Sequence, residues 1–289
     1  MFVKNTIMLA KSIAVCGAGT MGSGIAQMAA QSGLHTILFD INETVLLNGK
    51  KAIEKNLQLQ LAKNKLTEAT YELTLQHLSY TNDINNCKAN VIIEAIVENI
   101  EVKQQLFTQL QAVNSPATIY ASNTSSISIE KLSSSFNSPS LFCGMHFFNP
   151  ATVMKLVEII THTYTSNETI KIVEQLGKQM GKTTVVCKDS PGFIVNRVAR
   201  HYYLQAMLLI ENGTVTDIAT IDAVLENAGF KMGPFKLMDL IGLDVNFAVS
   251  NIVWNDMGKP KRLTPSTLQQ QMVSNAHLGK KTNKGFYNY

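Results

Sequence analysis

The sequence predicts an α/β protein in which a doubly wound, mostly parallel sheet is followed by an all-α domain. Apolar, strand-like runs alternate with helical patterns as far as about residue 188, which is typical of parallel sheets covered by helices. A glycine-rich turn joins the first of these strands to the first helix. Beyond Pro191 only helical patterns follow. We therefore expect two domains, over 1–189 and 190–289.

The glycine-rich turn has the form G-x-G-x-x-G, begins at Gly17 and follows the apolar run 13–16. A helical pattern over 23–31 and a second apolar run over 36–39 come next, and Asp40 ends that run. This context predicts a Rossmann-type site, because a helix N-terminus attracts phosphates and a carboxylate at the second strand end can hold both ribose hydroxyls. The residues predicted to bind the dinucleotide are Gly17, Ala18, Gly19, Thr20, Met21, Gly22 and Asp40.

The other elements are predicted from apolar runs, helical periodicity and the breaks between them. Further strands are expected at 91–95, 118–121, 141–145, 155–160 and 183–187. Helices of the first domain are expected at 100–113 and 168–180, together with a Lys- and Gln-rich helical hairpin over about 43–78. Helices of the second domain are expected at 196–211, 216–227, 234–254 and 265–276.

Composition excludes several classes of protein. An apolar content of 45% and a charged content of 16% exclude disorder, and no uncharged apolar run approaches the ~20 residues of a membrane span. The first ten residues are too short for a secretory or transit peptide. A net charge of +4 without a basic stripe argues against nucleic acid as a partner. The four cysteines have no metal-binding spacing, so we expect no metal and reduced core thiols in a cytoplasmic protein.

Polar side chains follow several of the predicted strands, at the edge where open α/β sheets bind ligands. The segment 122–126 follows one strand and the segment 146–150 follows another. Glu158 is expected to end the strand over 155–158, and Asn196 opens the first helix of the second domain. Each residue also has a purely structural interpretation. Ser125 could cap a helix, and His146 could be a strand-end imidazole whose hydrogen bonds are satisfied within the fold. Glu158 could be a solvated charge, and Asn196 a polar residue in the middle of a helix.

The joint placement of these side chains favours oxidation of an alcohol. Hydride leaves a carbinol carbon as the hydroxyl proton is removed, and the neutral imidazole of His146 can accept that proton near neutral pH. A carboxylate such as Glu158 on the other ring nitrogen would fix the tautomer and stabilise the imidazolium. The hydroxyl of Ser125 and the amide of Asn196 could hold the reacting oxygen. These four residues are the predicted catalytic set.

Eight segments together resemble the 3-hydroxyacyl-CoA dehydrogenase family, and within it the single-function 3-hydroxybutyryl-CoA dehydrogenases. In chain order the segments read GAGTMGSGIAQ, EAIVEN, SNTSSISI, HFFNP, VMKLVEI, PGFIVNR, MGPFKLMDLIGLD and GKKTNKGFY. The resemblance implies NAD as cofactor and reversible oxidation of an (S)-3-hydroxyacyl-CoA, with a short acyl chain, to a 3-ketoacyl-CoA. It also implies a homodimer formed through the helical domain.

The resemblance also implies roles for individual residues. His146 matches the family's catalytic base and Glu158 its partner, while Ser125 and Asn196 match a substrate-positioning pair. Contacts with NAD are implied for Glu98, Lys103, Ser125, Asn149 and Lys281, and contacts with CoA for Asn56, Lys63 and Ser125. Asn56, Leu59 and Thr152 depart from the family pattern, where Ser, a basic residue and Pro are common. These departures suggest fewer CoA contacts and a looser turn after Asn149.

Two other functions remain open at this point. A related class of enzymes oxidises sugar acids such as gulonate on the same scaffold, but it would not need a basic hairpin for CoA. A non-catalytic NAD-binding structural protein is the second alternative. The presence of His146, Glu158, Ser125 and Asn196 together argues against it.

Overall fold

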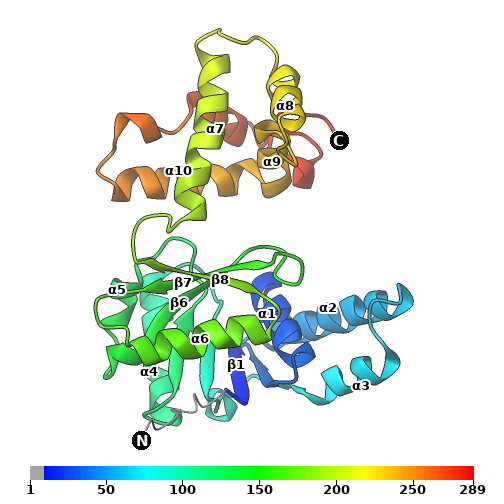
Figure 1. The fold of residues 1–289 in the computed structure, drawn as a ribbon, viewed down its shortest axis with the longest axis vertical. Coiled ribbons are helices and arrows are strands. Elements are labelled where there is room, and N and C mark those ends of the chain that lie inside the picture. Colours follow the sequence, from blue (N-terminus) through cyan, green and yellow to red (C-terminus); the bar gives the residue numbers. More distant parts are fainter. Residues whose placement is uncertain (1–9) are drawn as a thin grey trace, which may run out of the picture. The chain divides into compact units, whose positions relative to one another are not determined.

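The structure of the chain is a computed structural model that describes residues 10–289. The chain divides into two compact units, one ending at Asp189 and the other formed by Ser190–Tyr289. Figure 1 shows a sheet covered by helices in the first unit and a group of helices in the second. The prediction that the first ten residues are too short for a leader peptide falls largely on residues 1–9. These residues lie outside the part of the chain that the structure describes.

The first unit is built on one sheet, which has eight strands within the described residues. The strands are β1 (Ser12–Cys16), β2 (His35–Phe39), β3 (Leu78–Thr81), β4 (Val91–Glu94), β5 (Ile119–Ser122), β6 (Phe142–Phe147), β7 (Leu156–Thr161) and β8 (Thr183–Lys188). Their order is β3-β2-β1-β4-β5-β6-β7-β8, and among these neighbours only β6 and β7 are antiparallel. The predicted doubly wound, mostly parallel sheet is confirmed. The sequence did not indicate β3, whose four residues follow directly on a helical pattern.

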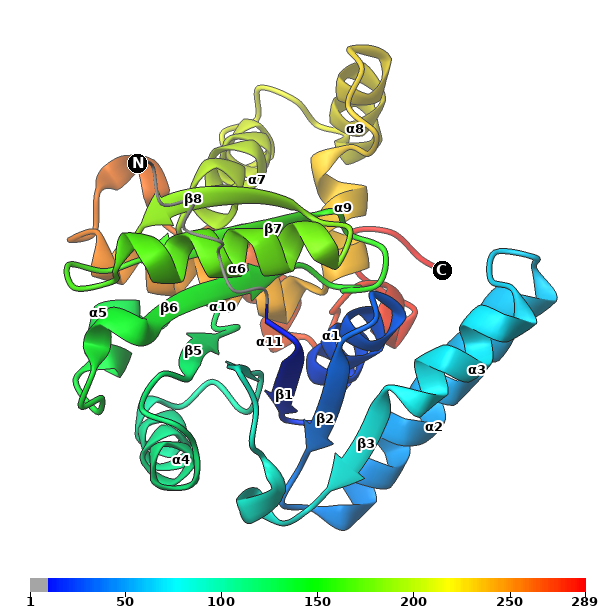
Figure 2. The same cartoon turned by 60° about the horizontal axis from the view of Figure 1, so that its bottom comes forward.

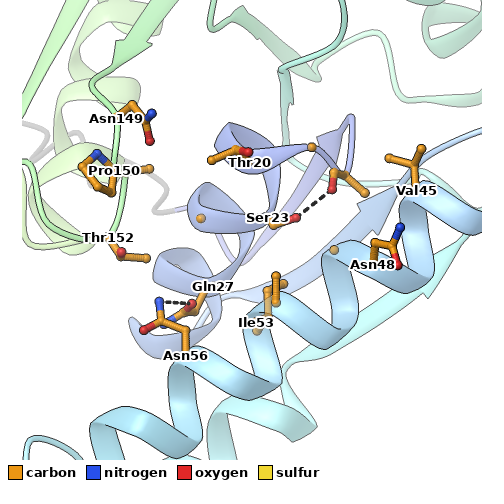
Figure 3. Close-up of a pocket in the computed structure, with 16 residues that line it drawn as sticks. Thr20, Ser23, Gln27, Val45, Asn48, Ile53, Asn56, Asn149, Pro150 and Thr152 are labelled. Atoms are coloured by element: carbon orange, nitrogen blue, oxygen red, sulfur yellow. Dashed lines mark hydrogen bonds between the residues drawn. The ribbon is translucent and has the colours of Figure 1, made fainter. Parts of the chain in front are cut away.

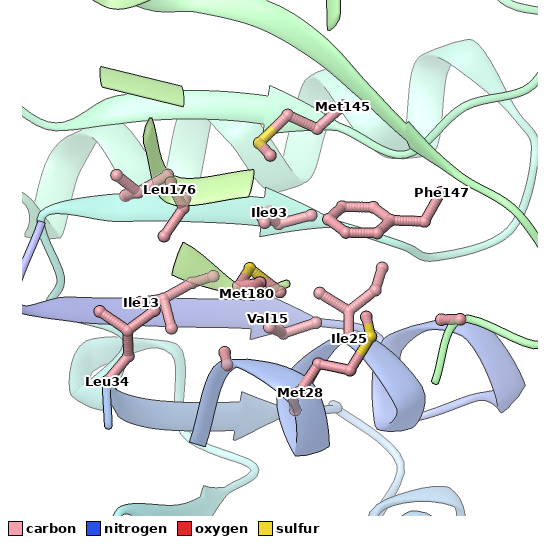
Figure 4. Close-up of a cluster of buried hydrophobic side chains, with 14 of the residues drawn as sticks. Ile13, Val15, Ile25, Met28, Leu34, Ile93, Met145, Phe147, Leu176 and Met180 are labelled. Atoms are coloured by element: carbon pink, nitrogen blue, oxygen red, sulfur yellow. The ribbon is translucent and has the colours of Figure 1, made fainter. Parts of the chain in front are cut away.

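Helices enclose this sheet and bury its apolar strands. They are α1 (Thr20–Gln31), α2 (Glu43–Ala62), α3 (Glu68–Gln76), α4 (Ile100–Val113), α5 (Ile129–Ser133) and α6 (Asn167–Gln179), with short 3-10 turns at η1 (Ile84–Asn86) and η2 (Pro139–Leu141). Figure 4 shows the core, where Ile13 and Val15 of β1 lie among side chains of the neighbouring strands and of α1 and α6. Since both faces of the central strands are covered, their sequences are continuously apolar rather than alternating.

The predicted hairpin is present as α2 and α3, which lie side by side and project at the β3 edge of the sheet (Figures 1 and 2). Side-chain caps begin both helices, since Asn42 accepts from the amide of Val45 and Thr67 from that of Thr70. In contrast, α1 begins at Thr20, three residues before the predicted start, and has no side-chain cap.

The second unit is helical and has its own core. Its helices are α7 (Val195–Glu211), α8 (Ile218–Asn227), α9 (Pro234–Ile241), α10 (Leu243–Asp256) and α11 (Thr267–Ser274), with 3-10 turns at η3 (Lys261–Leu263) and η4 (Lys280–Thr282). Phe235, Met238 and Met207 are fully buried at its centre. The expectation of one helix over 234–254 is wrong. Gly242 has φ of +102°, a conformation that ends a right-handed helix, and α9 and α10 meet there at 100°.

No single helix among residues 10–289 is long and apolar enough to cross a membrane. Only when α9 and α10 are taken together as one bent pair do they have the length and apolar composition of a membrane span.

Gly242→Ala should lower the free energy of unfolding of the helical unit by about 1–2 kcal/mol, because an L side chain is strained at positive φ. Trp254, the one tryptophan of the sequence, lies in α10, so its fluorescence during denaturant unfolding reports on this unit. Asn255→Ala, at an exposed position of the same helix, is the matched control and should change the free energy by less than about 0.5 kcal/mol. Equal effects of the two substitutions would contradict the strain argument.

Candidate active site

The glycine turn after β1 has the shape that a dinucleotide needs. A side chain at Gly17 would meet the carbonyl of Ala95, and one at Gly22 would overlap the carbonyl of Gly17, so both glycines are required for close backbone packing. A Cβ added at Gly19 would have no atom within 4 Å, so this glycine faces open space. The amides at the start of α1 have no side-chain cap, which leaves them for an anion.

Asp40 is held beside this turn by two backbone amides. Its Oδ2 accepts from the amide of Ala18 at 2.9 Å, and its Oδ1 accepts from that of Asn42 at 2.9 Å. The carboxylate is therefore fixed at the carboxyl end of β2, next to the uncapped start of α1. The turn, the helix start and Asp40 together fit the pyrophosphate and ribose of NAD.

A pocket of about 470 Å³ lies between α1, α2 and the loop that follows β6 (Figure 3). None of the described residues that line it carries a charge. Asn149, Thr152 and Asn48 contribute polar groups, and the Nδ2 of Asn56 donates to Gln27 across the pocket wall at 3.0 Å. Lys63 does not line this pocket; it is exposed at the C-terminal end of α2.

The loop after Asn149 is held by a lysine that the sequence did not indicate. Lys182 lies in the turn before β8, and its Nζ donates to the carbonyls of Ala151 at 2.6 Å and Met154 at 2.7 Å. Burial lowers the pKa of this amine. The loop that contains Thr152 is therefore fixed at two carbonyls.

His146 and Glu158 form a buried pair. The antiparallel register places these two residues directly opposite each other, so their side chains lie on the same face of the sheet. His146 Nδ1 and Glu158 Oε2 are 2.7 Å apart, and the side chains are 7% and 1% exposed. The ring of Phe148 packs against the imidazole with centroids 4.5 Å apart. The expectation that Glu158 ends its strand is wrong, since β7 continues to Thr161.

The turn that contains Ser125 is bound to Glu98. The Oε1 atom of Glu98 accepts from Thr124 Oγ1 at 2.5 Å, Ser126 Oγ at 2.8 Å and the amide of Ser125 at 3.2 Å. The neighbouring Asn123 accepts from the amide of Phe147 at 2.9 Å. Residues that follow β4 and β5 and the last residue of β6 are thus linked along the carboxyl edge of the sheet, where the glycine turn also lies.

Lys103 is buried beneath this turn, at 1% exposure, between two carboxylates. Its Nζ lies 2.5 Å from Glu94 Oε1 and 3.2 Å from Glu98 Oε2. Glu94, which the sequence analysis did not select, is fully buried at the end of β4. The sequence signal that could have identified Glu94 is its position directly after three apolar strand residues.

The remaining predicted residues belong to the helical unit. Asn196 lies in the first turn of α7, and its carbonyl accepts from the side chain of Arg200 at 3.0 Å. Lys281 lies in η4 and is paired with Asp244, with 2.6 Å between Nζ and the carboxylate.

Within residues 10–289 no three His, Cys, Asp or Glu side chains are grouped so that they could hold a metal ion. The four cysteines are free thiols. Cys187 is only partly buried, in the edge strand β8, so its expected core position is wrong.

Comparison with known proteins identifies the family. Residues 12–190 match the profile described as the NAD-binding domain of 3-hydroxyacyl-CoA dehydrogenase, and residues 192–289 match that of its C-terminal domain. The chain is 43% identical over 281 residues to the 3-hydroxyadipyl-CoA dehydrogenase of Escherichia coli (strain K12), covering 96% of this chain and 59% of that protein. It is 40% identical over 277 residues to the probable 3-hydroxybutyryl-CoA dehydrogenase of Deinococcus radiodurans, covering 95% and 99%.

Solved structures agree with these matches. The crystal structure of 3-hydroxybutyryl-CoA dehydrogenase from Escherichia coli K12 is similar with a TM-score of 0.95 and 43% identity, covering 97% of this chain and 60% of that one. The chain thus spans about three fifths of the Escherichia coli proteins and nearly all of the Deinococcus protein. With both units matched, the chain belongs to the 3-hydroxyacyl-CoA dehydrogenase family, and its first unit is the family's NAD-binding domain.

Proposed function

We propose that this chain interconverts (S)-3-hydroxyacyl-CoA and 3-ketoacyl-CoA with NAD, and that 3-hydroxybutyryl-CoA is its substrate. The buried pair of His146 and Glu158 is the observation that carries the proposal. It lies at the carboxyl end of β6, on the edge of the parallel sheet that also carries the glycine turn. Membership of the family supports the choice of substrate class.

The proposed chemistry requires a base beside the reacting carbon. NAD, when bound, supplies the acceptor of the hydride. Because Nδ1 of His146 is engaged with Glu158, Nε2 is the ring atom that takes the hydroxyl proton during oxidation and returns it during reduction. Glu158 stabilises the imidazolium that results. Ser125 holds the substrate oxygen, and by resemblance Asn196 also positions substrate.

The uncharged pocket beside α2 suits the pantetheine arm of CoA. That arm carries amides and a hydroxyl but no charge, and the pocket offers side-chain amides and hydroxyls from Asn48, Asn56 and Thr152. We assign the CoA phosphates to Lys63, an exposed cation at the end of α2. Contacts of NAD with Glu98, Asn149 and Lys281 are part of the same proposal.

The proposal extends to assembly and location. Large apolar side chains of the helical unit are exposed, and burying them in a homodimer would remove them from water. They include Val198, Leu208, Val224, Phe230, Leu240, Ile241 and Val245. Four free thiols are consistent with a reducing compartment, the cytoplasm.

The direct test mixes the purified chain with acetoacetyl-CoA and NADH and follows the absorbance of the reduced nicotinamide. We expect rapid oxidation of NADH, and initial rates over a series of acyl chain lengths should be highest for the four-carbon substrate. Turnover of gulonate without turnover of acyl-CoA would instead support a sugar-acid dehydrogenase. NADH binding without turnover of either substrate would support a non-catalytic protein.

NADH should be strongly preferred to NADPH. The fixed carboxylate of Asp40 would face the 2′-phosphate, and the next residues, Ile41, Asn42 and Glu43, offer no cation. Repulsion and lost ribose hydrogen bonds should cost roughly a hundredfold or more in kcat/KM. Asp40→Ser should narrow the ratio of the two kcat/KM values, whereas Asp256→Ser, at an exposed position of α10, should not. Comparable kcat/KM for both cofactors in the wild type would refute the assignment of Asp40.

Replacing His146 with Gln should remove proton transfer while retaining size and some hydrogen bonding. We expect kcat to fall by about 10²–10⁴-fold, with the dissociation constant of NADH nearly unchanged. His201→Gln, on an exposed site of α7, is the matched control and should retain wild-type kcat. A near-normal kcat in the His146 variant would show that another group is the base.

Glu158→Gln should slow the oxidative reaction, because the amide stabilises the imidazolium less than the carboxylate does. Since the two residues act as a unit, the double variant Glu158→Gln, His146→Gln should lose little more kcat than His146→Gln alone. The measurement is a double-mutant cycle on kcat. If the two losses simply multiply, Glu158 does not act through His146.

A further inference from the structure

The last residues of β6 extend beyond the end of the neighbouring strand β5. The parallel pairing of these strands ends where Ser122 lies opposite Gly144, whereas β6 continues to Phe147. The segment beyond this pairing contains His146, the proposed base. On its other side β7 pairs with the segment as far as Phe147, which lies opposite Val157. Among the described strands, only β7 therefore provides a backbone ladder along the end of β6.

On the β5 side a side chain takes the place of the missing strand. Asn123, the first residue after β5, accepts a hydrogen bond from the amide of Phe147 at 2.9 Å. Because a backbone amide can only donate, the accepting atom is the carbonyl oxygen Oδ1. The amide of Asn123 itself donates to the carbonyl of Glu94, the last residue of β4, at 2.8 Å. Asn123 thus joins the ends of β4 and β6 across the end of β5.

The hydrogen bond from Phe147 fixes the backbone beside the proposed base. The phenyl ring of Phe147 lies among apolar side chains such as Ile93 (Figure 4), and the residue is 2% exposed. An amide buried in this way requires an acceptor, since otherwise the loss of its hydration is not compensated. Because Phe147 directly follows His146, the same bond holds the backbone from which the imidazole projects. Glu158 sets the direction of the ring from β7.

We propose that Asn123 is a positioning residue, which holds the end of β6 so that His146 is correctly placed for proton transfer. This inference rests on the proposed function. A displacement of about 1 Å in a reacting group can cost about a hundredfold in rate, so one backbone contact beside the base can affect catalysis. The effect comes from the oxygen of the Asn123 amide, which is the atom that binds Phe147.

A double-mutant cycle with His146 tests this role. Asn123→Leu keeps the approximate size of the side chain but removes the acceptor, so kcat for acetoacetyl-CoA should fall by about tenfold to a hundredfold. KM for acetoacetyl-CoA and the dissociation constant of NADH should stay within about threefold of the wild type. In the His146→Gln background the same substitution should lower kcat by less than about threefold, because no base remains to be placed.

Two further variants test whether the oxygen atom and its place at this edge of the sheet matter. Asn123→Asp keeps an acceptor for Phe147 and should retain kcat to within about fivefold of the wild type. Asn90 is the matched control at the opposite edge of the sheet, where its Oδ1 accepts from the amides of Lys11 at 3.0 Å and Ser12 at 3.1 Å. Asn90→Leu should lower Tm, as Asn123→Leu does, but should leave kcat per folded enzyme unchanged.

Other outcomes would overturn the inference. Equal losses of kcat from Asn123→Leu in the wild-type and His146→Gln backgrounds would show that Asn123 does not act through the base. NADH binding that is weaker by about tenfold or more in both Asn123→Leu and Asn123→Asp would instead indicate direct contact with the cofactor through the amide nitrogen. A lower Tm with unchanged kcat per folded enzyme would leave Asn123 a purely structural role.

The test remains decisive if one variant fails. If Asn123→Leu does not fold, Asn123→Ala replaces it in both backgrounds with the same expected result. A wild-type chain without acyl-CoA activity would refute the proposed function itself. An active wild type in which Asn123→Leu gives any of the contrary outcomes would refute only the role of Asn123.

Discussion

The antiparallel register of β6 and β7 is the constraint on which the candidate site depends. Six parallel strands would place their polar residues only at strand ends, each reaching the edge from its own connection. Reversing β7 instead sets Glu158, an interior residue of β7, opposite His146 at the carboxyl end of β6, where the backbone ladder fixes the distance between them. A slip of one residue would turn the carboxylate to the opposite face of the sheet. The pair is therefore held by the sheet rather than by a loop.

Hydrogen bonds to charged side chains provide similar rigidity at the neighbouring strand ends. Lys182 fixes two carbonyls of the loop after Asn149, and Glu98 fixes three residues of the turn after β5. In each case one charged group makes several hydrogen bonds to the segment that it holds, and such bonds offset the cost of taking a charge out of water. Groups held in this way need little reorganisation when a ligand arrives.

Local sequence patterns predicted the features that depend on local backbone chemistry. The glycine turn, most helices and the apolar strands each follow from residues close in sequence, so the fold class and the position of Asp40 at the end of β2 could be predicted. The register that sets Glu158 opposite His146 could not be predicted, because the antiparallel pairing of β6 with β7 is not encoded in residues close in sequence. Gly242 was overlooked because its apolar neighbours continue the helical period across the bend. Lys182 and Glu94 act through contacts with residues distant in sequence, which no local pattern encodes.

The uncharged lining of the pocket has a consequence for how salt affects ligand affinity. Interactions between amides, hydroxyls and a neutral ligand segment carry no counterion atmosphere, so added electrolyte hardly screens them. Coulombic attraction would come from exposed lysines of the hairpin such as Lys63, and it weakens as ionic strength shortens the Debye length. In the proposed complex, salt would therefore weaken the attraction between the CoA phosphates and Lys63 but would hardly affect contacts in the pocket.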